Sequence, residues 1–131
     1  MPPALRAAQV FRVLGLIAPA SLSSELPNDA ASRAYYGAFH AASALLLSEG
    51  LAFNSYTSVL RGLSLHFVKT GILEPSYGRD SNWLAEVRQI ADYGELKNVA
   101  TTDAEQAVAI AELFLRKVRQ LLEQEQEDPA N

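Results

Sequence analysis

The sequence predicts an all-α protein, folded as an antiparallel up-and-down bundle of four to five helices. Its 21 alanines and 19 leucines far outnumber its 8 valines and 4 isoleucines, a balance that favours helix over sheet. Apolar residues recur at three- and four-residue spacing, and the segments between these runs are short and rich in glycine, proline or serine. Short connections between neighbouring helices favour antiparallel packing.

The length of 131 residues suits one compact domain, since a domain has roughly 150 residues. We expect residues 1–122 to form a single helical bundle. The remaining segment, residues 123–131, is rich in Glu, Gln and Asp, and it is predicted to be a flexible acidic tail.

Helix-capping residues indicate where the predicted helices begin. The second to fifth helices each follow a residue whose side chain can accept a hydrogen bond from a free helical N–H group. In chain order these caps are Asn28 or Asp29, Ser55, Ser81 and Thr102, the last in a capping box with Glu105.

Glycines indicate where three of the helices end. Gly50, Gly71 and Gly94 follow the second, third and fourth apolar runs, as expected of residues that accept a left-handed backbone at a helix end. A poorly capped first helix precedes a loop over residues 18–28, and residues 75–80 are predicted to be a second loop. The five predicted helices span residues 4–17, 29–49, 55–71, 81–94 and 102–123.

The fifth predicted helix carries one continuous apolar seam. Its spacing suits either packing inside the bundle or a coiled coil between two chains, but the seam spans barely three heptads, which favours packing inside the bundle. The residues of the seam are Ala104, Val108, Ala111, Leu115, Val118 and Leu122.

The second predicted helix has two distinct faces. A broad arc is apolar and is predicted to face the core; it contains Ala31, Tyr35, Ala38, Phe39, Ala42, Leu45 and Leu46. On the opposite side, Arg33, Tyr36, Gly37 and His40 fall within a narrow stripe. Gly37 either leaves a notch for a ligand between the phenol and the imidazole or admits a neighbouring helix.

The fourth predicted helix adds a second polar group of residues. Arg88 and Asp92 lie four residues apart, so their side chains can form an ion pair within the helix. Tyr93 and Gly94 follow, which presents a phenol beside a turn of the backbone. The apolar positions predicted to face the core are Trp83, Leu84, Val87, Ile90 and Ala91.

The net charge excludes an overall attraction to nucleic acid. The chain has 11 Lys and Arg residues against 15 Asp and Glu residues, a formal net charge of −4. It therefore lacks the general positive field that gathers RNA or anionic lipid, and any contact with RNA must depend on a local group of cations.

The composition predicts a cytoplasmic protein that does not bind membranes. Cysteine is absent, which excludes disulfides and a cysteine nucleophile and suits a reducing compartment. No apolar run approaches the roughly 18 residues of a membrane-spanning helix. The run Val13–Ile17 is also shorter than the apolar part of a signal peptide, which has about 7–15 residues.

No metal or cofactor is predicted. With two histidines, no cysteine and scattered carboxylates, the sequence shows no metal-binding constellation. His66 lies at the edge of an apolar helix face and is predicted to be a packed side chain. The sequence also contains no nucleotide-binding glycine loop or nucleophile elbow.

Three segments together resemble the HEPN domain family, in its branch of small stand-alone prokaryotic proteins. The resemblance extends from Ala30 to Leu122. The segments are RAYYGAFH at 33–40, FVKTG at 67–71 and RQIADYG at 88–94. It implies an antiparallel helical bundle, usually a homodimer, that is similar to the helical domain of aminoglycoside nucleotidyltransferases. It also implies pairing with a separately encoded minimal nucleotidyltransferase as toxin and antitoxin.

The resemblance also implies a reaction. Many HEPN proteins are metal-independent ribonucleases that use an Arg followed, after four to six residues, by a His. The matching arginine is Arg88, but Tyr93 and Gly94 stand where the His is expected. Such a reaction needs a cation that stabilises the phosphate and also a group that transfers protons. His40 can be the proton-transfer group only if the second and fourth helices are neighbours.

Two functions from different classes follow. In the first, the chain is a ribonuclease toxin, with Arg88, Asp92 and His40 as catalytic residues acting on RNA. In the second, it is a non-catalytic module that binds the nucleotidyltransferase and helps to hold nucleotide or substrate. Contacts with substrate or nucleotide are assigned to Arg33, Tyr36 and Tyr93, and Tyr93 is also a candidate acceptor for a nucleotidyl group.

Overall fold

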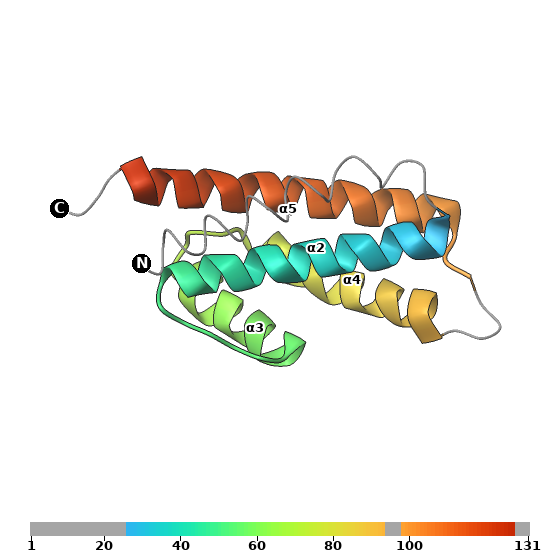
Figure 1. The fold of residues 1–131 in the computed structure, drawn as a ribbon, viewed down its shortest axis with the longest axis horizontal. Coiled ribbons are helices and arrows are strands. Elements are labelled where there is room, and N and C mark those ends of the chain that lie inside the picture. The colour runs from blue at the N-terminus through green and yellow to red at the C-terminus, as the bar shows by residue number, and fades with distance from the viewer. Residues whose placement is uncertain (1–25, 94–97, 128–131) are drawn as a thin grey trace.

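The computed structural model describes residues 26–93 and 98–127, and this part of the chain is helical without any strand. The predicted all-α class is therefore confirmed. The predicted first helix, residues 4–17, and residues 128–131 of the predicted tail lie outside the described residues. The elements are α2 (Pro27–Ser48), α3 (Tyr56–Leu63), the π-helical segment η2 (Ser64–Val68), α4 (Pro75–Tyr93) and α5 (Thr101–Glu127) (Figure 1).

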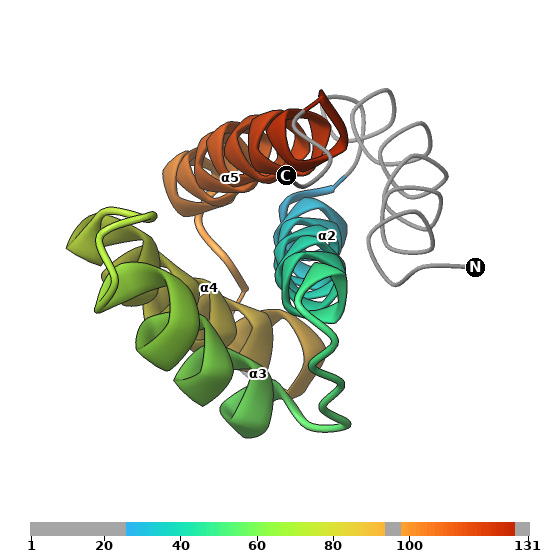
Figure 2. The same cartoon turned by 90° about the vertical axis from the view of Figure 1, so that its left-hand side faces the viewer.

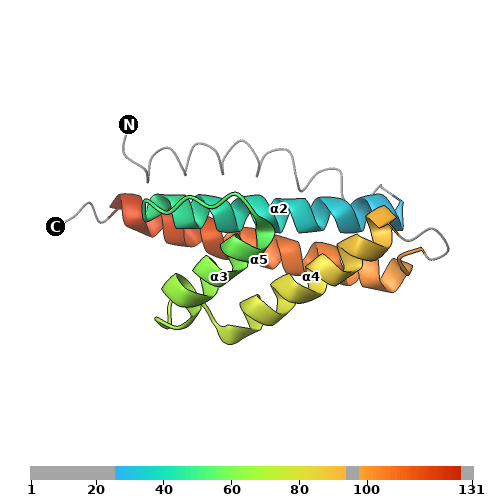
Figure 3. The same ribbon diagram turned by 90° about the horizontal axis from the view of Figure 1, so that it is seen from below.

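Helix α2 is the central element of the bundle and contacts α3, α4 and α5. In the end view, α5 and α4 cover different sides of α2, and α3 lies beside α4 (Figure 2). Helix α4 runs antiparallel to α2, whereas α5 runs in the same direction as α2 (Figure 1). This order arises because residues 49–55 lead back along α2 before α3 begins (Figure 3).

The core lies where α2, α4 and α5 meet. Alanines on α2 and α5, among them Ala34, Ala41 and Ala107, are almost fully buried, and their small side chains let the two helices approach closely. The predicted apolar face of α2 and the predicted seam of α5 both point into this core. Ile90 was predicted to face the core but is 39% exposed, because polar side chains make the contact with α2 at that end of α4.

The predicted cap of α2 is wrong. The helix begins at Pro27, whose fixed φ suits a first helical turn, and the N-cap residue Leu26 provides no side-chain hydrogen bond. Asn28 lies inside the helix, and its Oδ1 atom accepts a hydrogen bond from the backbone N–H of Val99 at 2.8 Å. Asn28 therefore ties α2 to the segment that leads into α5.

The predicted start of α3 is confirmed. The Ser55 hydroxyl accepts a hydrogen bond from the backbone N–H of Ser58 at 3.2 Å. Gly50 and Gly71 follow α2 and η2 with φ values of 78° and 84°, the left-handed region that favours glycine.

Helix α4 begins earlier than predicted, so the predicted loop over residues 75–80 is wrong. Pro75 starts the helix, and Ser81, the predicted cap, is buried in its interior, where its hydroxyl donates to the Tyr77 carbonyl at 2.8 Å. Helix α5 begins one residue before the predicted Thr102 and continues to Glu127, into the predicted tail. Among the described helices, none combines the length and the apolar character that a membrane span requires.

Candidate functional site

Four polar side chains form a continuous hydrogen-bonded network between α2 and α4. Arg88 Nε donates to Asp92 Oδ2 at 2.8 Å, and Arg88 Nη2 donates to the Tyr36 hydroxyl at 2.8 Å. The Ser32 hydroxyl donates to the other carboxylate oxygen of Asp92. We call Ser32, Tyr36, Arg88 and Asp92 the α2–α4 polar cluster.

The helical repeat explains this arrangement. Ser32 and Tyr36 are four residues apart on α2, and Arg88 and Asp92 are four residues apart on α4, so each pair shares one helix face. Because the two helices run antiparallel, the earlier residue on α2 meets the later residue on α4. The register of α2 against α4 thus places a carboxylate and a guanidinium group opposite two hydroxyl groups.

The guanidinium group of Arg88 also lies over two aromatic rings. Its Cζ atom is 5.0 Å from the ring centre of Tyr35 and 5.4 Å from that of Tyr36, within the range of cation–π attraction. The side chains of Arg88 and Asp92 are 21% and 24% exposed, so solvent and ligands can still reach them. Arg88 is therefore held in one position at an accessible surface.

Tyr56 supports the cluster from inside the bundle. Its ring centre lies 4.7 Å from that of Tyr35 and 5.7 Å from that of Phe39, and its hydroxyl donates to the Ser81 carbonyl of α4. Burial raises the pKa of Tyr56 above its usual value, and the neighbouring Tyr35 raises it further. Tyr56 is thus a neutral structural group that fixes the ring on which Arg88 lies.

The other residues of the predicted stripe surround the cluster. His40 is exposed and lies one helical turn beyond Tyr36, which places their Cβ atoms about 6 Å apart. Its ring meets the Phe39 ring edge-on at 5.5 Å, and among the described residues no hydrogen bond joins His40 to Arg88. Arg33 is also exposed on this face of α2. Tyr93 is the last residue of α4, and its side chain lies outside the described part.

Gly37 does not admit a neighbouring helix in the part of the chain that the structure describes. A Cβ atom added there would meet nothing within 4 Å among the described residues. Of the two interpretations of Gly37, the open notch between Tyr36 and His40 fits these residues better.

Two contributors to the site, Ser32 and Tyr35, were not predicted from the sequence. Ser32 was not singled out, although its position four residues before Tyr36 was a signal that it shares the polar stripe. Tyr35 was assigned only to the core, and it is buried as predicted, but one face of its ring carries the Arg88 guanidinium group. The contacts of Ser32 with Asp92 and of Tyr35 with Arg88 join two helices, so the spacing within one helix does not predict them.

The chemistry of the cluster suits a phosphate-bearing ligand. A positioned guanidinium group can donate paired hydrogen bonds to phosphate oxygens, and an exposed tyrosine ring can stack on a base. In the described segments, no three His, Asp or Glu side chains come together as a metal-binding group would.

Comparison with known proteins agrees with the resemblance found in the sequence. A model of the HEPN domain matches residues 17–121. A UPF0332 protein of Thermotoga maritima is 36% identical over 78% of this chain and 77% of its own length. Two proteins of Methanocaldococcus jannaschii, each named "Putative toxin", are 35% and 30% identical over 77% and 76% of this chain, and over 75% and 68% of their own lengths. The chain therefore belongs to the HEPN domain family.

Proposed function

We propose that this chain is the toxin-type HEPN component of a toxin–antitoxin pair, and that it cleaves RNA without a metal ion at the α2–α4 polar cluster. The observation that carries the proposal is the fixed and accessible Arg88, which Asp92 and Tyr36 hold by hydrogen bonds. Tyr36 in turn lies one helical turn from His40 on α2. The names of the two Methanocaldococcus jannaschii relatives support a toxin role.

The proposed reaction is an internal transfer of the phosphodiester. A ribose 2′-hydroxyl attacks the adjacent phosphorus and gives up its proton to the His40 imidazole. The bond from phosphorus to the 5′-oxygen breaks, and that oxygen takes a proton from water while the His40 imidazolium returns its proton to solvent, so the products are a 2′,3′-cyclic phosphate and a 5′-hydroxyl end. Arg88 stabilises the negative charge that gathers on the phosphate oxygens, and Asp92 and Tyr36 position it. In a homodimer, a second copy brings its own Arg88 to the same RNA.

Replacing His40 by glutamine is expected to lower RNA cleavage about 100-fold, the usual loss when a proton-transfer group is removed. The chain offers a matched control, because its only other histidine, His66, lies on η2 outside the cluster. His66→Gln is expected to keep full activity. Cleavage of a fluorescent RNA by the purified variants measures both, and equal activity of the two variants would contradict the role of His40.

The second candidate function is a non-catalytic module that binds a minimal nucleotidyltransferase. Two observations favour it: no histidine follows Arg88 at the family's spacing, and within the described residues no hydrogen bond connects His40 with Arg88. In this function the exposed stripe of Arg33, Tyr36 and His40 faces the partner and contributes contacts to its nucleotide.

Co-expression with a separately encoded minimal nucleotidyltransferase is expected to yield a stable complex that survives size-exclusion chromatography at micromolar concentration. Adding ATP then tests Tyr93 as an acceptor, since its phenol oxygen would attack the α-phosphorus and release pyrophosphate. The intact mass would rise by one nucleotidyl group, and Tyr93→Phe would not show this rise. Failure of the two proteins to associate would remove the module function.

A further inference from the structure

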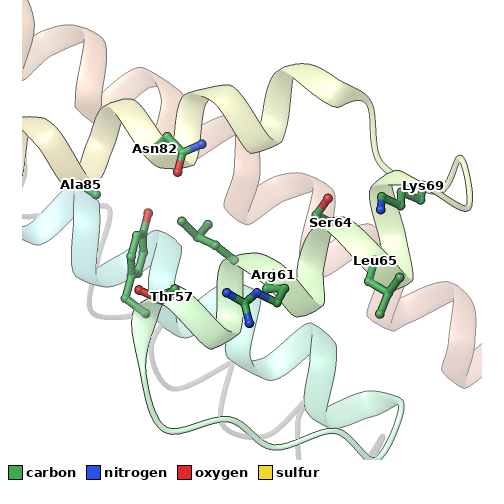
Figure 4. Close-up of a pocket in the computed structure, with 9 residues that line it drawn as sticks. Thr57, Arg61, Ser64, Leu65, Lys69, Asn82 and Ala85 are labelled. Atoms are coloured by element: carbon green, nitrogen blue, oxygen red, sulfur yellow. The ribbon is translucent and has the colours of Figure 1, made fainter.

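A groove with a largely apolar lining and two basic side chains lies between α3 and α4, outside the α2–α4 polar cluster. Its volume is about 740 Å³, and Figure 4 shows side chains entering it from both helices. Thr57 and Arg61 come from α3, and Asn82 and Ala85 come from α4. Ser64 of η2 and Lys69, which follows η2, line its far end. We call this the α3–α4 groove.

The charge of the groove differs from that of the whole chain. The protein has more acidic than basic residues, yet two cations and no carboxylate line the groove. Within the described residues, neither Arg61 nor Lys69 forms an ion pair. The groove therefore offers two uncompensated positive charges to an anionic ligand, together with the hydroxyl groups of Thr57 and Ser64 and the amide of Asn82.

The π-helical segment shapes this surface. The Lys69 N–H group donates to the Ser64 carbonyl, five residues earlier, at 2.8 Å. Leu65, the second residue of this segment, lines the groove and is 53% exposed, on the same outward face as Arg61 four residues earlier. Single turns of π-helix are frequent at functional sites.

The groove leads toward the α2–α4 polar cluster. Ala85 lines the groove and lies three residues before Arg88, so the two positions share one face of α4. Tyr56 also lines the groove, and its ring packs against Tyr35, whose ring carries the Arg88 guanidinium group. One helical turn and one aromatic layer thus separate the groove from the proposed reaction centre.

We infer that the α3–α4 groove binds the sugar–phosphate backbone of single-stranded RNA beside the phosphodiester that is cleaved at Arg88, with Arg61 and Lys69 contacting phosphates. This inference rests on the proposed ribonuclease function. Arg61 and Lys69 lie eight positions apart along α3 and η2, which suits contacts with different phosphates of one extended strand. The groove has the size of a small-molecule pocket, so it accommodates a single strand rather than a duplex.

The test measures binding apart from cleavage. A fluorescent 2′-O-methyl RNA oligonucleotide lacks the attacking hydroxyl and reports Kd by fluorescence anisotropy. The double variant Arg61→Gln with Lys69→Gln is expected to raise Kd about 10-fold. It should also reduce the salt dependence of binding by about 1.4 in log–log slope, at roughly 0.7 for each phosphate contact of a single strand. The control double variant Arg79→Gln with Arg116→Gln makes the same change of charge at exposed positions outside the groove and is expected to change Kd less than 2-fold.

The outcomes separate the two proposals. If the wild-type protein binds the RNA and both double variants weaken binding equally, the groove assignment is overturned while cleavage at Arg88 stands. If binding of the 2′-O-methyl oligonucleotide depends on Arg61 and Lys69 but the wild-type protein does not cleave unmodified RNA, the groove assignment stands and the ribonuclease function fails. If the wild-type protein does not bind the oligonucleotide, both are overturned. Circular dichroism of each variant establishes that its helices are intact.

Discussion

Replacing Arg88 by glutamine is expected to lower RNA cleavage about 1,000-fold, with little change in the stability of the fold. The loss is this large because the substitution removes the charge that stabilises the crowded phosphate, and an amide cannot replace it. Stability should change little because Asp92 is left at a partly exposed position where water can solvate it. Initial rates of RNA cleavage and urea unfolding curves measure the two effects separately.

Two further variants distinguish a direct role of Arg88 from a structural one. Arg88→Lys keeps the charge, but its single ammonium group cannot reproduce the planar guanidinium that bonds Asp92 and Tyr36 together, so it should restore cleavage only in part. Arg79→Gln removes an arginine from the same helix at an exposed position and should cleave normally. Normal cleavage by Arg88→Gln would remove the α2–α4 polar cluster as the reaction centre.

Predictions from single-helix spacing succeeded where the helix itself decides the structure. The apolar faces of α2 and α5 follow from a repeat of 3.6 residues, and the Ser55 cap follows from a local hydrogen bond. The start of α4 was missed because Pro75, Gly78 and Asp80 are typical of a loop. In the structure this turn is helical, and its Tyr77 packs against Phe114 of α5 with ring centres 5.7 Å apart. The spacing of residues in the sequence does not show this contact between helices.

The same limit applies to the candidate site: contacts within one helix could be predicted from the sequence, and contacts between helices could not. The ion pair of Arg88 with Asp92 lies within one helix, so the sequence predicted it. The contacts of Ser32 and Tyr36 with this pair depend on which helix lies beside α4 and in which direction it runs. Direction is set by the way residues 49–55 return along α2, a feature that the lengths of the connecting segments do not encode.

Replacing Leu45 by alanine is expected to lower the free energy of unfolding by about 3 kcal/mol. Leu45 is 2% exposed on the central helix α2, and its loss removes buried apolar contacts and leaves a cavity that neighbouring helices fill only in part. Leu113→Ala makes the same chemical change on α5 at a side chain that is 57% exposed, and it should cost less than about 0.5 kcal/mol. Urea unfolding followed by circular dichroism compares the two. Equal costs would contradict a core centred on α2, and with it the support that this helix gives to Tyr36 at the site.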